Sequence, residues 1–192
     1  VLGHEFSGEV VGVGSGVKSV KVGDRVSGAP LLPCHGCVDC SRGHYSQCKN
    51  YSFIGSRSFG SWAEYVKLPA INAVKLPEGV DFVQGAFLEP ATVALHGLFV
   101  MDFRGGCDVA IVGMGTIGLL TLQCAKALGA KRIFAFDVDH KKLDIAREYG
   151  ADVCINTGEE NFREMIEELT HGRGFEMVVE AAGVEFTEKL CL

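Results

Sequence analysis

The chain has 192 residues, of which 47% are hydrophobic and 22% charged, and its formal net charge is −6. This is the composition of a globular protein with room for one large or two small domains. The acidic balance disfavours a nucleic-acid or anionic-membrane partner, and no apolar run approaches the roughly 20 residues that span a bilayer. No segment is typical of a signal peptide.

The eight cysteines fall into two groups. Four are clustered within residues 34–48, whereas Cys107, Cys124, Cys154 and Cys191 stand singly in apolar patterns, as buried thiols do. This usage argues against a disulfide framework and for a reducing compartment. We therefore expect a cytoplasmic protein.

Residues 1–103 predict a mainly-β domain. Residues 8–26 alternate β-branched residues with glycines, which is typical of strands joined by tight turns. The segments 63–68 and 72–77 predict two further short strands. Residues 78–101 have helical spacing, which we expect Pro90 to interrupt.

From residue 104 to residue 192 the pattern changes to alternating strands and helices. Apolar runs predict strands, and amphipathic segments between them predict helices. The strands are expected at 107–113, 132–137, 152–156 and 175–183, and the helices at 116–130, 139–151 and 159–172. Such alternation predicts βαβ units on a parallel sheet, which is an α/β Rossmann-type domain.

A glycine motif lies where the first strand of this domain meets its first helix. Gly113, Gly115 and Gly118 have G-x-G-x-x-G spacing, which suits a pyrophosphate at the helix N-terminus. Asp137 ends the next strand nineteen residues after Gly118, where a carboxylate can bind both ribose hydroxyls and repel a 2′-phosphate. This favours NAD over NADP, with Lys142 flanking the ribose. The alternative is a Rossmann-like domain that binds another nucleotide or none.

The clustered cysteines, Cys34, Cys37, Cys40 and Cys48, have the spacing of a metal site. Four thiolates suit tetrahedral zinc and close its coordination shell, which predicts a structural role. The C-x-x-C-x-x-C opening also fits the start of an iron–sulfur run, but the fourth cysteine comes too late and lysine, not proline, follows it. A nucleic-acid-binding zinc ribbon is the other alternative, which the acidic charge disfavours.

A second, catalytic metal would need protein ligands and one open position. His4, Glu5 and Glu89 are candidates, although each alone is also consistent with a structural role. A histidine between glycine and glutamate is often a hydrogen-bonded structural residue, and a glutamate before Pro90 can simply end a helix.

Four segments taken together carry a family resemblance: GHEFSGEVVGVG, the cysteine cluster, LEPATVALHG and GMGTIG, in this order. They resemble the zinc-containing medium-chain dehydrogenases of the alcohol and sorbitol dehydrogenase kind, over essentially the whole chain. The resemblance implies a GroES-like catalytic domain over residues 1–103 and a Rossmann domain over residues 104–192. Both are expected to be incomplete in this chain.

The resemblance also implies roles for single residues. His4 and Glu89 match ligands of the catalytic zinc in the polyol-dehydrogenase branch, and Glu5 matches a neighbouring glutamate that can enter the metal shell. The four clustered cysteines match the structural-zinc lobe. The positions that match NAD-binding residues are Gly113, Gly115, Ile117, Gly118, Asp137 and Lys142. One ligand of the catalytic zinc in the family, a cysteine, precedes the G-H-E motif, and we expect it upstream of this sequence.

The substrate expected from the resemblance is a small polyol or polyol phosphate, oxidised with NAD. Arg57, in the run FIGSR, is a candidate partner of the phosphate because a guanidinium matches phosphate oxygens; a solvated loop arginine is the alternative. Family members form dimers or tetramers, so a homo-oligomer is expected. Two rival functions remain open: a sorbitol-, threonine- or butanediol-type dehydrogenase, and a non-catalytic zinc protein that binds a dinucleotide.

Overall fold

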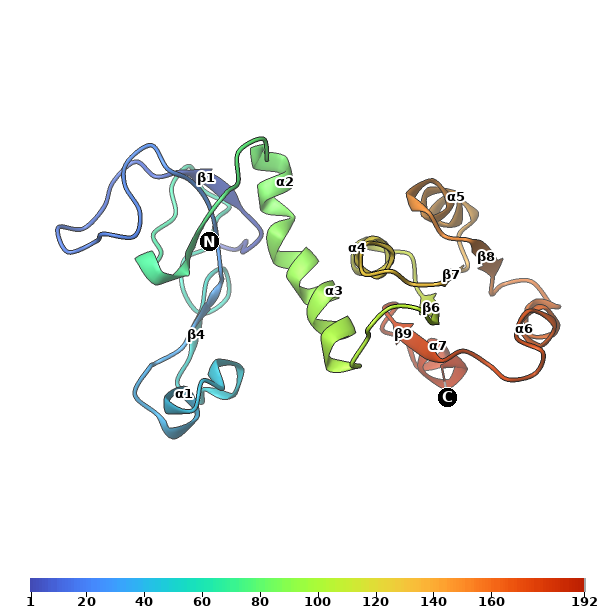
Figure 1. Ribbon diagram of the computed structural model, residues 1–192. Helices are drawn as coiled ribbons and strands as arrows, with labels where there is room; N and C mark the ends of the chain where they lie inside the picture. The colour runs from blue at the N-terminus through green and yellow to red at the C-terminus, as the bar shows by residue number, and fades with distance from the viewer. Residues whose placement is uncertain (192) are drawn as a thin grey trace. The chain divides into compact units, whose positions relative to one another are not determined.

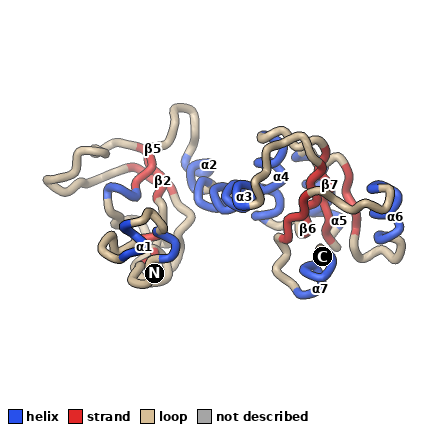
Figure 2. Tube along the Cα trace, turned by 60° about the horizontal axis from the view of Figure 1, so that its bottom comes forward, coloured by secondary structure: helices blue, strands red, loops and turns tan. Residues whose placement is uncertain are grey.

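The computed structural model describes residues 1–191 and forms two compact units, Val1–Glu89 and Pro90 onward (Figure 1). The first unit is mainly loop, with short strands (Figure 2). Its three-stranded antiparallel sheet has the order β1-β2-β5, and β3 pairs with β4 in a second ladder. The bounds of these strands are β1 Ser7–Glu9, β2 Arg25–Gly28, β3 Leu31–Leu32, β4 Ser52–Phe53 and β5 Ala73–Lys75.

The strands predicted around residues 8–26 and 72–77 are confirmed as β1, β2 and β5, but they are shorter than predicted. The strand predicted over residues 63–68 is wrong, because this segment is a loop. Its side chains nevertheless alternate, with Val66 and Leu68 half-buried and Tyr65 and Lys67 exposed. The alternating sequence pattern therefore predicted which side chains of this segment are more buried. No strand among residues 1–191 pairs with the backbone of the segment, so it does not form a strand itself.

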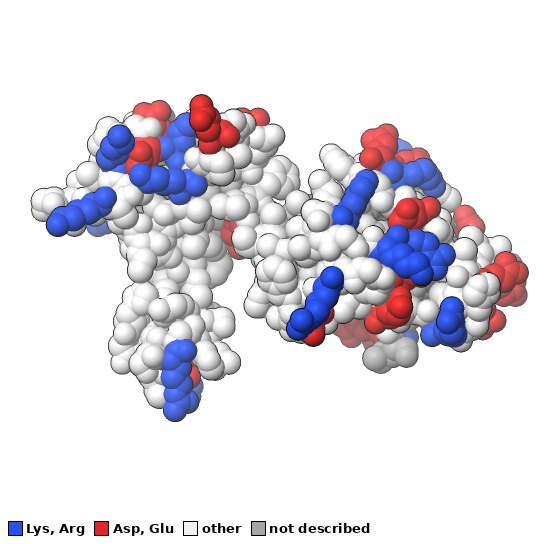
Figure 3. Space-filling model, viewed as in Figure 1, with Lys and Arg blue, Asp and Glu red and all other residues white. Residues whose placement is uncertain are grey.

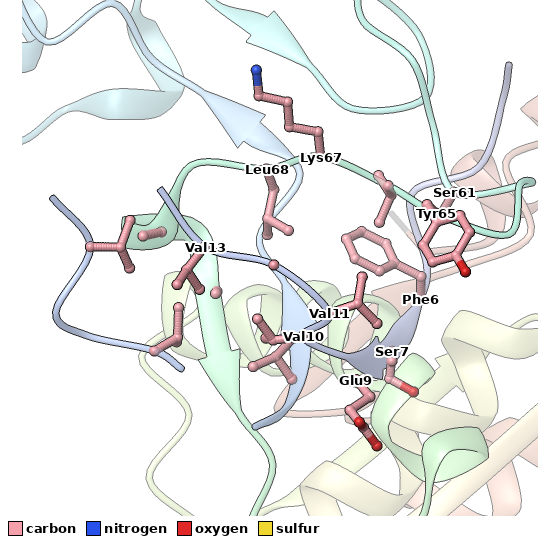
Figure 4. Close-up of a pocket in the computed structure, with 18 of the residues that line it drawn as sticks. Phe6, Ser7, Glu9, Val10, Val11, Val13, Ser61, Tyr65, Lys67 and Leu68 are labelled. Atoms are coloured by element: carbon pink, nitrogen blue, oxygen red, sulfur yellow. The ribbon is translucent and has the colours of Figure 1, made fainter. Parts of the chain in front are cut away.

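The half-buried side of this loop lines an apolar groove (Figure 4). Val10, Val11 and Val13 form its opposite wall, and in this view Lys67 and Glu9 extend away from the apolar side chains. Because the lining is dominated by valine and other apolar groups, the groove offers little catalytic chemistry.

The helical segment predicted over residues 78–101 forms two helices, α2 (Phe82–Ala86) and α3 (Leu88–Val100). Asp81 caps α2 through a reciprocal pair of hydrogen bonds with Gln84, at 2.7 and 3.0 Å. The predicted interruption at Pro90 is wrong: the break lies before α3, and Pro90 occupies the first turn of α3. A proline is tolerated there because the first-turn N–H groups have no partner within the helix.

The second unit is a parallel sheet of order β8-β7-β6-β9 with helices on both faces (Figure 1). The predicted Rossmann-type alternation is confirmed. The strands are β6 Asp108–Val112, β7 Arg132–Asp137, β8 Val153–Asn156 and β9 Met177–Glu180. The helices that follow them are α4 Thr116–Ala127, α5 His140–Tyr149, α6 Phe162–Thr170 and α7 Glu185–Leu190. Within residues 1–191, none of the helices combines the length and the apolar character that crossing a membrane would need.

Two apolar layers hold this sheet. Alternate residues of one strand point to opposite faces, so Ile111 packs in one layer and Ala110 in the other. Residues of α3, α4 and α5 complete the first layer, and residues of α6 and α7 complete the second. The strand residues are buried on both sides, which explains their continuous apolar runs.

The compact units divide between Glu89 and Pro90, so most of α3 belongs with the parallel sheet. Leu98 of α3 explains this, because it is fully buried in the same apolar layer as Val109 and Ile111 of β6. The boundary at residues 103/104 remains a prediction about functional domains, as compactness alone does not test it.

Leu98 provides a direct test of this packing. Leu98→Ala is expected to lower the free energy of unfolding by about 2–5 kcal/mol, because it leaves a cavity in a close-packed layer. Val100→Ala is the matched control on the same helix: Val100 is 71% exposed, and a change within about 0.5 kcal/mol is expected. Urea denaturation of the full-length protein measures both. Equal effects of the two substitutions would contradict the packing described above.

Candidate metal and dinucleotide sites

Three predicted metal ligands, His4, Glu5 and Glu89, come together in the first unit. Each offers one ligand atom, and these atoms lie within 4.8 Å of one another. His4 and Glu5 precede β1, whereas Glu89 lies in the first turn of α3. An imidazole and carboxylates are ligands that zinc takes in catalytic sites, and three of them leave a fourth position open. The donor set therefore fits a zinc ion.

Backbone packing holds the segment that carries His4. Gly60 and Trp62 donate their N–H groups to the carbonyls of Val1 and Leu2, both at 2.9 Å, and Ser61 donates to Gly3 at 2.9 Å. A Cβ at Gly60 would lie 2.3 Å from the carbonyl oxygen of Leu2, so only a glycine permits this approach. Residues 60–62 thus fix the backbone immediately before His4.

Phe53 is a residue that the sequence analysis missed. Its ring packs edge-on against the His4 imidazole, with 5.3 Å between ring centroids and an interplanar angle of 73°. Phe53 is in β4, opposite Leu31 of β3. No local sequence signal marks it, because its position beside His4 depends on how β4 pairs with β3. The contact orients the imidazole and gives the cluster an apolar neighbour.

The environment of Glu89 favours a bound cation. Burial raises the pKa of the Glu89 carboxyl; His4 opposes this shift and the nearby Glu5 adds to it. A half-buried carboxylate beside a second carboxylate is costly when both are charged. A divalent cation would remove that cost, because it stabilises the charged form of both groups.

The four clustered cysteines also come together, within 4.8 Å by their sulfur atoms. Cys37 precedes the short helix α1 (Val38–Ser41), which carries Cys40, and a 3₁₀ turn (Tyr45–Gln47) leads to Cys48. The N–H of Cys34 donates to the Cys48 sulfur at 3.3 Å. Four sulfur atoms fill a tetrahedral shell, so this cluster fits a structural zinc with no open position.

The thiols of this cluster differ in acidity. Burial raises the pKa of Cys40 to about 12, whereas the N–H of Cys34 lowers the pKa of Cys48. Zinc binds thiolates, so a zinc ion here must displace the proton of Cys40. Loading of the cluster is therefore expected to weaken as the pH falls, since protons compete for the sulfurs.

The glycine motif has the geometry of a dinucleotide turn. Gly113 follows β6 with φ of 98°, and a Cβ at Gly118 would lie 1.8 Å from the Gly113 carbonyl oxygen. This close contact packs α4 against the strand. A Cβ at Gly115 would meet no atom within 4 Å, so open space lies beside the N-terminus of α4. A pyrophosphate fits there, against the first backbone N–H groups of the helix. Ile117 lies in the same first turn.

Asp137 lies at the carboxyl end of β7, beside this turn. It accepts hydrogen bonds from the N–H groups of Met114, at 2.7 Å, and Asp139, at 3.0 Å. Lys142 of α5 places its Nζ 3.7 Å from the same carboxylate. The bond to Met114 connects the glycine turn to β7, and it holds the Asp137 side chain where an adenosine ribose would lie in a Rossmann fold.

Arg57 lies on the turn that follows β4. The backbone N–H of Arg57 donates to the Phe53 carbonyl at 2.9 Å. This turn therefore joins Arg57 to the residue whose ring packs against His4. The exposed guanidinium stacks on Tyr51, 4.0 Å from the ring centroid, and Nη1 donates to the Tyr51 carbonyl at 3.3 Å. Its role toward a phosphate remains a prediction.

The two metal clusters should respond differently to substitution. The full-length protein is expected to hold two zinc ions per chain. Cys40→Ser should remove the structural ion and lower the melting temperature, because that ion braces the lobe. Glu89→Ala should remove the other ion with little loss of stability, since the Glu89 side chain is only half-buried and belongs to neither apolar layer. Elemental analysis and thermal melting measure both effects; two zinc ions retained in Glu89→Ala would contradict the assignment.

The glycine turn allows a separate test. Gly115→Ala should leave the melting temperature unchanged but weaken NADH binding at least about tenfold, because the methyl group occupies the space of the pyrophosphate. Gly118→Ala should also destabilise the fold, because its Cβ would clash with the Gly113 carbonyl. Fluorescence titration and thermal melting separate the two effects. Unchanged NADH affinity in Gly115→Ala would show that no dinucleotide binds at this turn.

Comparisons with known proteins match both units. The alcohol dehydrogenase GroES-like domain matches residues 1–78, and the zinc-binding dehydrogenase domain matches residues 116–192. Galactitol 1-phosphate 5-dehydrogenase of Escherichia coli K12 is 44% identical over 191 residues, which are 100% of this chain and 55% of that protein. Its crystal structure superposes with a TM-score of 0.92 at 45% identity, covering 98% of this chain and 55% of the other.

Two other relatives differ in what they are named for. An L-threonine 3-dehydrogenase of Vibrio cholerae is 36% identical over 184 residues, covering 96% of this chain and 53% of that protein. A solved zinc-binding dehydrogenase of Sinorhizobium meliloti 1021, bound to NADP, has a TM-score of 0.91 at 36% identity, covering 99% of this chain and 56% of the other. The chain thus spans about half the length of the proteins it matches. With both domain models matched in order, the chain belongs to the zinc-containing medium-chain alcohol dehydrogenase family.

Proposed function

We propose that the full-length protein is a zinc-dependent polyol dehydrogenase that oxidises galactitol 1-phosphate to tagatose 6-phosphate with NAD. The observation that carries the proposal is the convergence of His4, Glu5 and Glu89, three metal-ligating groups from separate segments, into one cluster. A protein that only bound a dinucleotide would not need this open set of ligands. The observation therefore favours an enzyme over the non-catalytic alternative.

The phosphorylated substrate is supported by similarity. The run FIGSR and its surroundings resemble galactitol 1-phosphate 5-dehydrogenase, and a relative of that name is 44% identical. Arg57 in this run is the proposed phosphate partner. Its guanidinium is exposed and held on Tyr51, so it would be oriented before substrate arrives.

The chain's own residues have distinct tasks in such a reaction. A zinc ion, when bound, supplies Lewis acidity that favours the ionised form of a substrate hydroxyl. His4 and Glu89 would hold the metal. Glu5 adds negative charge beside it, which makes the metal less acidic and its ligands easier to exchange. Phe53 supplies an apolar wall, which limits the access of water to His4.

The second unit would hold the cofactor. A nicotinamide dinucleotide, when bound, is the hydride acceptor. The open space at Gly115 receives its pyrophosphate, and Asp137 receives the hydroxyls of its adenosine ribose. The carboxylate of Asp137 supports NAD rather than NADP, because it would repel a 2′-phosphate. We further propose a homodimer or homotetramer in the cytoplasm, as the family resemblance and the unpaired cysteines suggest.

An L-threonine dehydrogenase is the second candidate, because relatives of that name are 36% identical over nearly the whole chain. L-threonine, the substrate in that case, carries an ammonium group and a carboxylate instead of a phosphate. Arg57 would still have an anionic partner, so the position of Arg57 alone does not separate the two functions. Substrate preference does.

The deciding experiment follows NADH formation by the full-length protein with four substrates: galactitol 1-phosphate, galactitol, sorbitol and L-threonine. We expect the highest kcat/KM with galactitol 1-phosphate. Arg57→Ala should raise KM for this substrate at least about tenfold, the effect of losing a charge-assisted hydrogen bond, and leave KM for galactitol unchanged.

The matched control is Arg104→Ala, which removes an exposed arginine paired with Asp102 in the second unit. This variant should behave as the unsubstituted protein. Preference for sorbitol or L-threonine would overturn the sugar-phosphate proposal but retain the dehydrogenase. No NADH formation with any of the four would count against the polyol proposal as a whole.

A further inference from the structure

The order of the strands places a second segment beside the glycine turn. From β6 the chain passes through β7 to β8 on one side, and β9 then pairs with β6 on the other side. A Rossmann fold binds its dinucleotide outside the carboxyl ends of the strands, at the point where the strand order reverses. This point lies between β6 and β9, so the segment that follows β9 borders the proposed dinucleotide site.

Residues 181–183 lie directly against the glycine turn. The Ala181 N–H donates to the Val112 carbonyl at 2.8 Å. A Cβ at Gly113 would lie 2.7 Å from the Ala182 nitrogen and 2.9 Å from the Ala182 Cβ, so this segment occupies the space that a side chain at position 113 would need. Ala182 is itself exposed. Residues 181–183 therefore form an accessible wall beside the turn, and their position sets how much room a dinucleotide has there.

The Glu180 carboxylate, at the end of β9, holds this wall in place. Its Oε1 accepts hydrogen bonds from the N–H groups of Ala182, at 2.9 Å, and Gly183, at 3.0 Å. The same oxygen accepts from the hydroxyl of Thr187, a buried residue of α7, at 2.7 Å. The Thr187 hydroxyl and the two N–H groups hold the pKa of Glu180 below its usual value, although burial opposes this shift. The carboxylate thus ties the wall to α7 through charge-assisted hydrogen bonds.

The path of a bound dinucleotide indicates which half of it this wall would meet. Its adenosine ribose would lie at Asp137 on β7 and its pyrophosphate at the turn after β6, so the remaining half continues toward β9. We propose that Glu180 is a positioning residue for the nicotinamide half of the dinucleotide, and that it acts through residues 181–183. This inference rests on the proposed function, in which a nicotinamide dinucleotide binds at the glycine turn.

The test compares the binding of NADH and of AMP to the full-length protein, by fluorescence titration with NADH and by its displacement with AMP. AMP carries the adenosine and one phosphate but nothing beyond them. Glu180→Ala should weaken NADH binding at least about tenfold, because the hydrogen bonds that hold the wall are lost, and should leave AMP binding unchanged. A role of Glu180 in stability alone would weaken the binding of both ligands alike or of neither, and either result would overturn the proposal.

Glu176→Ala is the matched control. Glu176 precedes β9 at the opposite, amino edge of the sheet, and its carboxylate also accepts a backbone N–H, from Asp108 at 2.8 Å. Both substitutions remove a carboxylate that bonds to the backbone, but only Glu180 lies at the edge where a dinucleotide binds. Glu176→Ala should therefore change neither affinity, and a loss of NADH affinity as large as that of Glu180→Ala would contradict the proposal.

Two milder variants keep the test decisive if Glu180→Ala does not fold. Thr187→Val preserves the shape of the side chain but removes the hydroxyl that fixes Glu180, and it should weaken NADH binding about fivefold, the effect of one hydrogen bond, without changing AMP binding. Glu180→Gln keeps an oxygen acceptor and should retain most of the NADH affinity. Unchanged NADH binding in a folded Thr187→Val protein would also overturn the proposal.

Failure of this inference is distinguishable from failure of the proposed function. If the unsubstituted protein does not bind NADH, the proposed function is wrong and this inference falls with it. If Gly115→Ala weakens NADH binding but Glu180→Ala and Thr187→Val do not, the dinucleotide binds at the glycine turn and only the role of Glu180 is wrong.

Discussion

Both candidate sites depend on backbone that approaches backbone more closely than a side chain would allow. In the first unit, Gly60 lets the 60–62 segment bond directly to the residues before His4. In the second, Gly118 brings α4 against the Gly113 carbonyl and so sets the dinucleotide turn. In each case the glycine performs no chemistry. It fixes the position of the backbone from which the chemistry is presented, and rigid placement is what a metal or phosphate site requires.

Electrostatics then separates the two sites by function. Asp137 is a buried carboxylate whose charge is compensated from within, by backbone N–H groups and Lys142. Glu89 lies among His4 and Glu5, and burial raises its pKa. The Asp137 carboxylate thus has its partners within the protein itself, as suits a group that positions a ribose. A cation would stabilise the charged form of the second carboxylate, Glu89, as suits a metal ligand.

On the surface, basic and acidic side chains are intermixed on the face of the second unit in view (Figure 3).

The sequence predicted the second unit more closely than the first, for a physical reason. Strands buried on both faces need continuous apolar runs, so β7 was predicted with its observed bounds, Arg132–Asp137. Strands of two to four residues carry little pattern, and segment 63–68 shows that alternation reports side-chain burial even where no strand partner exists. Metal and glycine motifs were found because their chemistry limits residue type and spacing.

Residues that act through tertiary pairing were not found from the sequence. Phe53 reaches His4 because β4 pairs with β3, and Asn156 reaches His140 because β8 lies in register with β7. Neither phenylalanine nor asparagine is unusual at a strand end, so one chain offers no signal for either. Phe53 touches a residue that a motif names, because its ring packs against the His4 imidazole. Asn156 instead contacts His140, which belongs to no motif. Motif residues therefore indicate the type of site, while a neighbour supplied by the fold, such as Phe53, packs against the groups that the motifs name.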